Sequence, residues 1–354
     1  MATGAVTPGM GEQLKVCVCT AQVPFVRGGA EQAVEGLVAA LHQAGHAAEV
    51  VRLPVAWGRD QVLASALAWR LIEVSADVVI ATNFPSYYVR HPRKVVWLFH
   101  QHRAAYDVMD SEWSDFDLSE DALSVQQTLT DWDTRVLEEA VGRFALSEEV
   151  AARLRRSNGL TATPLYHPAP LQAVLSPGDY GDYLFCASRL EANKRVDLAV
   201  RALAESSSGM RLVVAGDGSL RPELVTLVRR LGLRARVELA GFVDDAHLVQ
   251  LFRGARAVIY PPHQEDYGYV TLQAFAARKA VITATDSGGV LEWVVEGETG
   301  AVGEPDPASL GRAIDRLVGA GPERIRAMGE RGHERIRGLR WDRVVDTLLS
   351  AARR

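Results

Sequence analysis

The sequence predicts an α/β protein with two doubly wound parallel sheets, and two patterns carry that prediction. Short apolar stretches typical of strands alternate with amphipathic stretches typical of helices along most of the 354 residues. From His167 to Gly181 this alternation gives way to Pro, Gly and Ser with little periodicity, and we place an interdomain linker at 171–182. The length and the 48% apolar content suffice for two separate cores.

The first domain is expected at residues 14–170, after a flexible tail over residues 1–13. This tail is rich in Gly, Ala, Pro and Thr, and it lacks both the basic region and the apolar core of a signal peptide. Apolar stretches predict strands at 14–20, 48–53, 77–82, 94–99 and 143–146. Amphipathic patterns predict helices at 30–44, 61–74, 119–142 and 147–156.

The second domain is expected at residues 183–338, followed by a last helical segment over 339–354. Residues 216–221, Gly-Asp-Gly-Ser-Leu-Arg, follow a predicted strand and look like a dinucleotide fingerprint. The pattern ends in Arg, and no ribose-binding acid follows about 20 residues on, so a nicotinamide site is poorly supported.

Strands of the second domain are predicted at 183–187, 211–215, 236–240, 257–260 and 281–283. Helices are predicted from 269 and at 307–318, 322–336 and 341–352.

Composition limits the possible partners. The net charge of -5 and the pI near 6.0 argue against nucleic acid. No apolar stretch approaches the ~18 residues of a membrane helix, and the Arg-rich stretch 324–340 could at most touch an anionic membrane surface. Cys17, Cys19 and Cys186 lie in apolar strand-like stretches, which predicts buried reduced thiols and a cytoplasmic protein. The sequence leaves the oligomeric state open.

The stretch from Pro261 to Phe275 concentrates the chemistry of the second half. An apolar strand ends at a Pro pair, two acids and a Gly follow, and a helical pattern begins at Tyr269. The first backbone N–H groups of that helix have no partner within it and favour an anion. Glu265 and Asp266 would repel a phosphate but can accept hydrogen bonds from hydroxyl groups. Phosphate and hydroxyls in one pocket suggest a sugar nucleotide.

Residues 265–275 resemble the E-x7-E signature of the retaining glycosyltransferase family 4, whose members have the two-domain GT-B fold. The resemblance implies that Glu265 holds hydroxyls of the donor sugar. It also implies a cleft between an N-terminal acceptor-binding domain and a C-terminal nucleotide-sugar-binding domain, both Rossmann-like, with the last helix crossing back onto the first domain. Further donor-binding residues implied by the signature are Tyr267, Gly268, Tyr269 and Val270.

One position departs from the signature. Gln273 stands where the family has a second Glu, which holds the ribose of the nucleotide. Gln is nearly isosteric with Glu and still forms hydrogen bonds, but it loses the stronger charge-assisted bond to the ribose, a difference of about 1 kcal/mol. We therefore expect donor affinity or nucleotide choice to differ, while the sugar contact through Glu265 is kept.

Arg189 and Lys194 follow the strand predicted at 183–187. They suit a diphosphate, because Arg can bind two oxygens at once and Lys adds a point charge. A solvated loop is the alternative, but the two residues match the Arg and Lys pair that binds donor phosphates in family 4. The resemblance also implies that Gly28 and Gly29 face the diphosphate and that Phe242 lies beside the base.

His100 directly follows the strand predicted at 94–99, and ligands of such sheets bind at the carboxyl ends of the strands. A lone histidine is often structural, but the resemblance implies that His100 faces the transferred sugar. Two D-x-D patterns, at 115–117 and 131–133, match metal-dependent transferases. Both lie away from a strand end, so we interpret them as unrelated to catalysis and expect no metal site.

The sequence thus predicts a retaining, metal-independent glycosyltransferase with Glu265, His100, Arg189 and Lys194 as catalytic residues. It would move a hexose-type sugar from a nucleotide diphosphate sugar, with a UDP-sugar favoured and no further cofactor, to a hydroxyl of a small-molecule, lipid or saccharide acceptor. The alternatives are a GT-B epimerase or phosphorylase, or a sugar-nucleotide-binding protein with weakened catalysis, for which Gln273 is the motive. The acceptor surface could include Tyr87, Tyr88, Arg103 and Tyr106, which could equally be ordinary packing.

Overall fold

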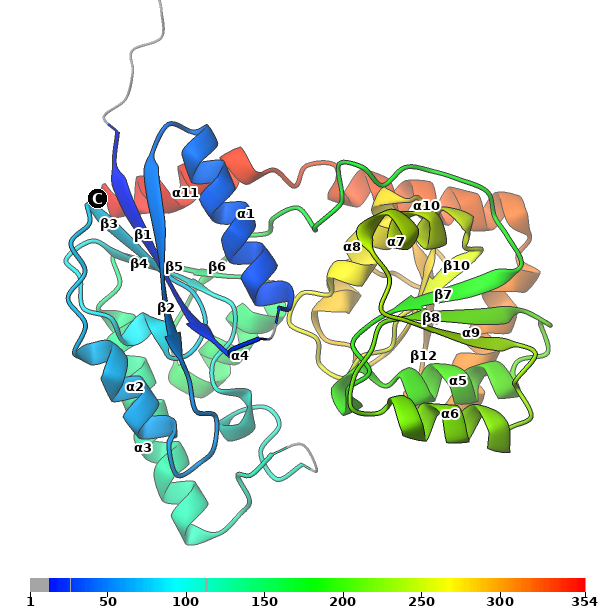
Figure 1. Cartoon of the computed structure of the whole chain (residues 1–354), viewed down its shortest axis with the longest axis horizontal. Coiled ribbons are helices and arrows are strands. Elements are labelled where there is room, and N and C mark those ends of the chain that lie inside the picture. The colour runs from blue at the N-terminus through cyan, green and yellow to red at the C-terminus, as the bar shows by residue number, and fades with distance from the viewer. Residues whose placement is uncertain (1–12, 26, 112–113, 354) are drawn as a thin grey trace, which may run out of the picture. The chain divides into compact units, whose positions relative to one another are not determined.

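The computed structural model describes residues 13–25, 27–111 and 114–353, in two compact units (Figure 1). The first unit contains the chain up to Ala145, together with Leu154–Leu165 and Trp341–Arg354. The second unit contains Leu146–Arg153 and Tyr166–Arg340. Each unit is built on a six-stranded parallel sheet with helices, which confirms the predicted α/β fold class.

The sheet of the first unit has the strand order β2-β1-β3-β4-β5-β6. The order reverses between β1 and β3, and such a switch point is where doubly wound sheets bind ligands. Strands β3 and β4 are buried over their whole length, as expected where helices cover both faces. The strands are β1 Lys15–Gln22, β2 Ala47–Pro54, β3 Val78–Ala81, β4 Lys94–Leu98, β5 Gly142–Ala145 and β6 Thr163–Pro164, and the helices are α1 Gly29–Gln43, α2 Val62–Arg70 and α3 Glu120–Glu138. Helix α4 (Glu148–Asn158) is divided, because its residues up to Arg153 belong to the second unit.

The last helix, α11 (Trp341–Ala352), belongs to the first unit, as predicted. Its buried face, Val344 to Ala352, packs among α1 and the strands β3 to β5. Gly36 of α1 leaves the space that this packing needs, because a Cβ there would lie 2.3 Å from Cζ2 of Trp341. The helix therefore completes the core of the unit in which the chain begins.

The sheet of the second unit has the order β12-β11-β10-β7-β8-β9, so its switch point lies between β7 and β10. The loops after these two strands carry Arg189, Lys194 and Glu265, which brings the predicted donor residues to the ligand-binding edge. The strands are β7 Tyr183–Ala187, β8 Arg211–Ala215, β9 Val237–Gly241, β10 Ala257–Ile259, β11 Val281–Ala284 and β12 Gly300–Gly303. The helices are α5 Val196–Glu205, α6 Arg221–Arg230, α7 Asp245–Gly254, α8 Tyr269–Ala276, α9 Pro307–Gly319 and α10 Pro322–Ile336.

The segment between the sheets differs from the expected linker. The prediction ends the first domain at 170 and leaves 171–182 between the domains, whereas the structure assigns residues 166–182 to the second unit. Polar contacts fix the end of this segment: Gly181 N–H donates to the carbonyl of Gly254 at 2.9 Å, and the ammonium of Lys279 donates to the carbonyl of Asp179 at 2.7 Å. These bonds hold a Pro- and Gly-rich sequence that has no helix or strand of its own.

Asp133, on α3, is a fully buried carboxylate that accepts three hydrogen bonds from tyrosines. Tyr87, Tyr88 and Tyr106 donate their hydroxyl protons to it at 2.9, 2.6 and 2.7 Å. The three hydroxyl groups are therefore used inside the first unit. This favours the alternative that the tyrosines are ordinary packing over the alternative that they line an acceptor surface. Asp131 of the same D-x-D pattern accepts from Gln127 at 2.8 Å on the surface.

The buried carboxylate makes a pH-dependent contribution to stability. Burial raises the pKa of Asp133 to about 6, although the three tyrosine hydrogen bonds lower it. Because the folded pKa lies above the ordinary value of 3.8, the folded chain binds the proton more tightly than the unfolded chain between these pH values. The contribution is full below pH 4 and is lost as the pH rises through 6.

Asp133→Asn should remove this dependence. In denaturant unfolding, we expect the free energy of unfolding of the wild type to fall relative to that of the variant by on the order of 3 kcal/mol between pH 4 and 7. A difference that does not change with pH, or one that favours the wild type at high pH, would contradict the assignment.

Candidate donor site

The loop after β7 is held against the loop after β8 by backbone contacts. The N–H of Leu190 donates to the carbonyl of Asp217 at 2.9 Å. Gly216 has φ +132°, and a Cβ there would lie 1.8 Å from the carbonyl oxygen of Ser188. Gly218 is similarly close to the backbone of Leu190. The fingerprint-like glycines at 216–218 are therefore explained by the approach of two loops, without any ligand.

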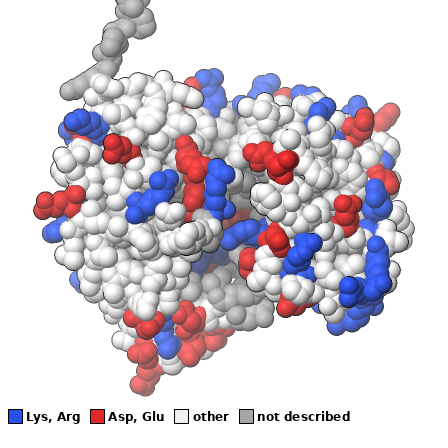
Figure 2. Space-filling view, viewed as in Figure 1, with Lys and Arg blue, Asp and Glu red and all other residues white. Residues whose placement is uncertain are grey.

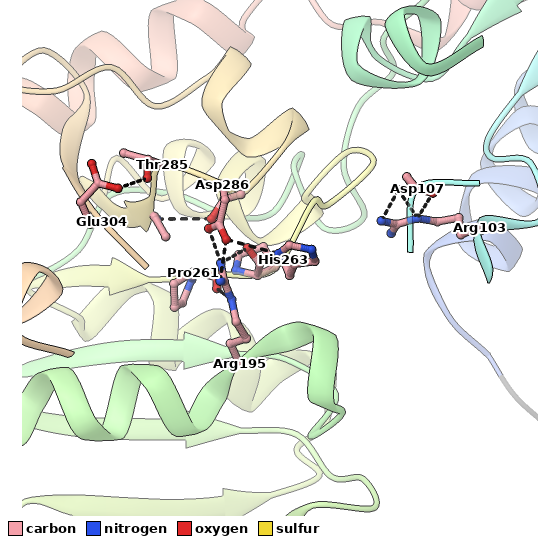
Figure 3. Close-up of polar contacts among 11 residues, drawn as sticks. Arg103, Asp107, Arg195, Pro261, His263, Thr285, Asp286 and Glu304 are labelled. Carbon is pink, nitrogen blue, oxygen red and sulfur yellow. Dashed lines mark hydrogen bonds and ion pairs between the residues drawn. The ribbon is translucent and has the colours of Figure 1, made fainter. Parts of the chain in front are cut away.

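Arg195 ties three loops together (Figure 3). Its Nη1 and Nη2 atoms bond to the two carboxylate oxygens of Asp286, at 2.8 and 2.6 Å. Its Nε and Nη2 atoms also donate to the carbonyls of Pro261 and Pro262, at 2.9 and 2.7 Å. Burial would raise the pKa of Asp286, but Arg195 and His263 outweigh it and hold that pKa below its ordinary value. The three loops follow β7, β10 and β11.

The backbone of Glu265 is fixed by the glycine turn that follows β11. The N–H of Gly289 donates to the carbonyl of Glu265 at 2.7 Å, and the N–H of Gln264 donates to the carbonyl of Asp286 at 2.9 Å. A Cβ at Gly288, which has φ +60°, would lie 2.7 Å from the carbonyl oxygen of Glu265. Only glycine allows this approach without strain.

Helix α8 begins directly after this loop with exposed hydrogen-bond donors. Gly268 precedes the helix with φ +78°, and a Cβ there would lie 2.8 Å from Cγ2 of Val290. Within the described chain, the backbone N–H groups of Tyr269 and Val270 donate to no other residue. Unpaired amides at a helix start attract an anion, as the sequence predicted for this position.

The side chains of Lys194 and Glu265 lie together. The ammonium of Lys194 pairs with Oε2 of Glu265, and the hydroxyl of Tyr260 donates to the same oxygen at 2.9 Å. Arg189 is exposed, and it forms no hydrogen bond or ion pair with the rest of the described chain. Arg189 lies in the same loop after β7 as Lys194, at the carboxyl edge of the sheet. Two cations, a carboxylate and free amides thus meet at the switch point.

Two of the predicted donor-binding side chains contact residues 166–171 instead of an open site. The hydroxyl of Tyr267 accepts from the N–H of His167 at 2.8 Å and donates to its carbonyl at 2.5 Å. The hydroxyl of Tyr269 lies 3.3 Å from Nε2 of His167, whose ring stacks on Tyr267 at 4.7 Å. Burial lowers the pKa of His167 to about 3, so its ring is neutral. The side chains of Tyr267 and Tyr269 therefore hold the segment 166–171. Only the backbone groups of these residues remain for a ligand at the start of α8.

The side-chain amide nitrogen of Gln273 also donates a hydrogen bond to the segment 166–171. Gln273 is 8% exposed, and Nε2 donates to the carbonyl of Pro170 at 3.1 Å. A glutamate at this position would place a carboxylate oxygen against a carbonyl oxygen, because an ionised carboxylate has no proton to donate. The departure from the family signature therefore has a structural consequence in this chain, and Oε1 of Gln273 is the only acceptor that the side chain keeps.

Asp266 and Phe242 complete the second unit's part of the predicted site. Asp266 pairs at 2.6 Å with Arg153, whose side chain is 2% exposed, so this acid is committed to α4. Phe242 follows β9 and is 84% exposed. β9 is the edge strand of the second sheet, and an aromatic ring this exposed is available to stack on a planar group such as a base.

The other predicted residues lie in the first unit. Gly28 is the N-cap of α1, and its N–H donates to Oε2 of Glu31 at 2.8 Å. A Cβ at Gly28 would approach no closer than 3.5 Å, so packing does not require a glycine there, and Gly29 opens the helix. His100 is half-buried, and Nδ1 lies 2.9 Å from the carbonyl of Gln101. Its ring centroid is 6.2 Å from that of Trp57.

The remaining D-x-D pattern is used by Arg59. Its N–H donates to Asp115 at 2.6 Å, and its guanidinium pairs with Asp117 at 3.2 Å and with Asp121 at 3.7 Å. Figure 2 shows acidic side chains gathered around the start of α3, in the lower left of the view.

Arg103 pairs with Asp107 at 2.6 Å (Figure 3). Among the described residues, no group of three or more His, Cys, Asp or Glu could hold a metal ion.

Sequence reasoning missed three residues of this site. Arg195 is adjacent to Lys194, and nothing in the pattern showed that one cation is structural while the other faces the ligand edge. Asp286 begins a Gly-rich turn after the strand predicted at 281–283, and a turn pattern does not show that its first residue binds a cation. Tyr260 was assigned to a strand, and a polar residue at the end of a buried strand was the available signal.

Comparison with known proteins agrees with this arrangement. Residues 174–335 match the family model described as "Glycosyl transferases group 1". A D-inositol 3-phosphate glycosyltransferase of Kineococcus radiotolerans is 34% identical over 215 residues, which cover 53% of this chain and 49% of that protein. An alpha-D-kanosaminyltransferase of Streptomyces kanamyceticus is 32% identical over 134 residues, covering 37% and 34%. The chain spans about half the length, or less, of the curated relatives it matches.

Solved structures share the fold across almost the whole chain. Sucrose-phosphate synthase from Thermosynechococcus elongatus aligns with TM-score 0.76 at 19% identity, covering 97% of this chain and 98% of that one. Anabaena HepE in complex with UDP and glucose aligns with TM-score 0.70 at 17% identity, covering 96% and 99%. The two parallel-sheet units thus have the GT-B fold that these structures share. Residues 174–335 of the chain are similar to the group 1 glycosyltransferases.

Gln273→Glu should destabilise the protein in a pH-dependent way. Above the pKa of the introduced carboxyl, the lost donor and the facing carbonyl should cost about 1–3 kcal/mol of unfolding free energy. At low pH the protonated acid can again donate to Pro170, so the difference from wild type should shrink. Denaturant unfolding at pH 4.5 and 8 measures both, and an unchanged stability at pH 8 would show that the contact is unimportant.

Proposed function

We propose that the protein is a retaining, metal-independent glycosyltransferase that uses a nucleotide diphosphate sugar. The observation that carries the proposal is the pairing of Lys194 with Glu265 beside the start of α8 at the switch point of the second sheet, with Arg189 in the same loop as Lys194. The cations and amides suit a diphosphate, and the carboxylate suits sugar hydroxyls. The family match supports the same chemistry.

The proposed mechanism is electrostatic. As the bond between the sugar and the diphosphate breaks, negative charge develops on the leaving phosphate. Arg189, the two N–H groups of Lys194 that Glu265 does not use, and the amides of Tyr269 and Val270 would stabilise that charge. Glu265 would hold the sugar. The leaving phosphate would then take the proton of the acceptor hydroxyl, with attack on the face from which the nucleotide departs.

The residues of the first unit keep the roles that the sequence predicts for them. Gly28 and Gly29 would approach the diphosphate, and His100, at the carboxyl end of β4, would face the transferred sugar. The acceptor would bind through this unit. No helix in the described part of the chain has both the length and the apolar character needed to cross a membrane.

A UDP-sugar is the favoured donor. Structures of similar fold contain UDP with glucose, and UDP-glucose. The exposed ring of Phe242 could stack on a uracil, and Oε1 of Gln273 could accept one hydrogen bond from a ribose hydroxyl. A panel of nucleotide sugars, assayed by mass spectrometry for hydrolysis and for transfer to hydroxylated acceptors, tests this choice.

Gln273 also motivates a second candidate, a sugar-nucleotide-binding protein with weakened catalysis. The panel separates the two functions. A donor that stabilises the protein against heat but is neither hydrolysed nor transferred would favour the binding protein. Release of the nucleotide diphosphate together with a glycosylated product supports the transferase, and conversion of the donor to an epimer without release would contradict it.

Lys194→Ala and Glu265→Ala should each lower sugar transfer by roughly 100-fold or more, because each removes a charged group in contact with the donor. Both variants should fold normally. Arg229→Ala and Glu334→Ala remove exposed charges elsewhere in the same unit and serve as controls that should keep full activity. Near-normal turnover by either site variant would refute the assignment.

Chelation should leave turnover unchanged. If fixed cations and amides neutralise the diphosphate, transfer measured in excess EDTA should equal transfer in Mg²⁺ within about twofold. A loss of activity in EDTA that added Mg²⁺ or Mn²⁺ restores would contradict the proposed mechanism.

A further inference from the structure

Tyr260 is a polar contact of the donor site that the family signature does not include. It follows β10 directly, is 4% exposed, and donates its hydroxyl proton to Oε2 of Glu265 at 2.9 Å. Its backbone is fixed by β11: its N–H donates to the carbonyl of Ile282 at 2.8 Å, and its own carbonyl accepts from Oγ1 of Thr283 at 2.7 Å. The hydroxyl therefore projects from a backbone that two hydrogen bonds tie to the neighbouring strand.

The two donors to Glu265 use the same oxygen. Lys194 and Tyr260 both bond to Oε2, and Oε1 forms no hydrogen bond with the rest of the described chain. A carboxylate has acceptor sites on both oxygens, so Oε1 keeps its capacity for a ligand. Together the two contacts hold the carboxylate in one orientation, whereas a single contact would leave it free to rotate.

Tyr260 can act only as a donor here. Burial, followed by the negative charge of Glu265, raises the pKa of Tyr260 well above its ordinary value. The hydroxyl therefore keeps its proton at neutral pH and donates it to Glu265. A role as a general base is excluded by the same reasoning.

We propose that Tyr260 is a positioning residue, whose hydroxyl, with Lys194, holds Oε2 of Glu265 so that Oε1 faces the hydroxyls of the donor sugar. This inference rests on the proposed function. It implies that the contribution of Tyr260 depends on the sugar and not on the nucleotide, because the proposed function assigns Glu265 to the sugar hydroxyls and not to the diphosphate.

Tyr260→Phe tests the inference, with Tyr183→Phe as the matched control. The hydroxyl of Tyr183 donates to the carbonyl of Leu251 at 2.8 Å in the same unit, away from Glu265. With the nucleotide sugar that the wild type turns over fastest, kcat of Tyr260→Phe should fall roughly tenfold, as for a lost bond to a charged acceptor. The affinity for UDP should change less than about twofold. Tyr183→Phe should alter neither.

A double variant separates positioning from stability. In a Glu265→Gln background, Tyr260→Phe should lower kcat by less than about twofold, since the charged acceptor that the hydroxyl holds is gone. A full tenfold loss in that background would mean that Tyr260 acts on the fold and not through Glu265.

Crystal structures of the wild type and Tyr260→Phe without ligand give a readout that needs no donor. The wild type should show one conformer of Glu265, and the variant should show a rotated or split carboxylate. An unmoved Glu265 together with wild-type turnover would overturn the inference. A wild type that processes no nucleotide sugar would instead overturn the proposed function, while the two crystal structures would still decide whether Tyr260 positions Glu265.

Discussion

The candidate site depends on one nearly buried cation. Arg195 is 14% exposed, and its guanidinium satisfies both oxygens of Asp286 and the carbonyls of Pro261 and Pro262. A buried charge is tolerated only where its hydrogen bonds are satisfied, and removing one partner of such a pair typically costs about 3–5 kcal/mol. Because its partners come from the loops after β10 and β11, Arg195 holds together the loop that carries Glu265 and leads into α8 and the glycine turn that fixes the backbone of Glu265.

The polar groups around this cation divide into two sets. Arg195, Asp286, Asp266 and Oε2 of Glu265 have partners within the chain, and these contacts fix the loops. Arg189, two N–H groups of Lys194, Oε1 of Glu265 and the first amides of α8 have none in the described chain. The second set has a net positive character next to a single carboxylate oxygen. That combination fits an anionic phosphate joined to a hydroxylated sugar.

Much of this architecture could be predicted from the sequence. Alternating strands and helices indicated the two sheets, and the strand ends placed Arg189, Lys194 and Glu265 at one edge because carboxyl ends of parallel strands meet there. The sequence could not show where individual side chains point. Tyr267, Tyr269 and Gln273 have the spacing of the signature, yet their polar atoms hold His167 and Pro170. Irregular segments such as 166–182 carry no periodicity, so their contacts with the second unit were invisible to pattern reasoning.

The most direct measurement is a crystal structure with a nucleotide sugar bound. The account predicts the diphosphate against Arg189, Lys194 and the first turn of α8, with a sugar hydroxyl within hydrogen-bond distance of Oε1 of Glu265. A nucleotide that occupies another part of the chain, or a sugar held without any contact to Glu265, would contradict it.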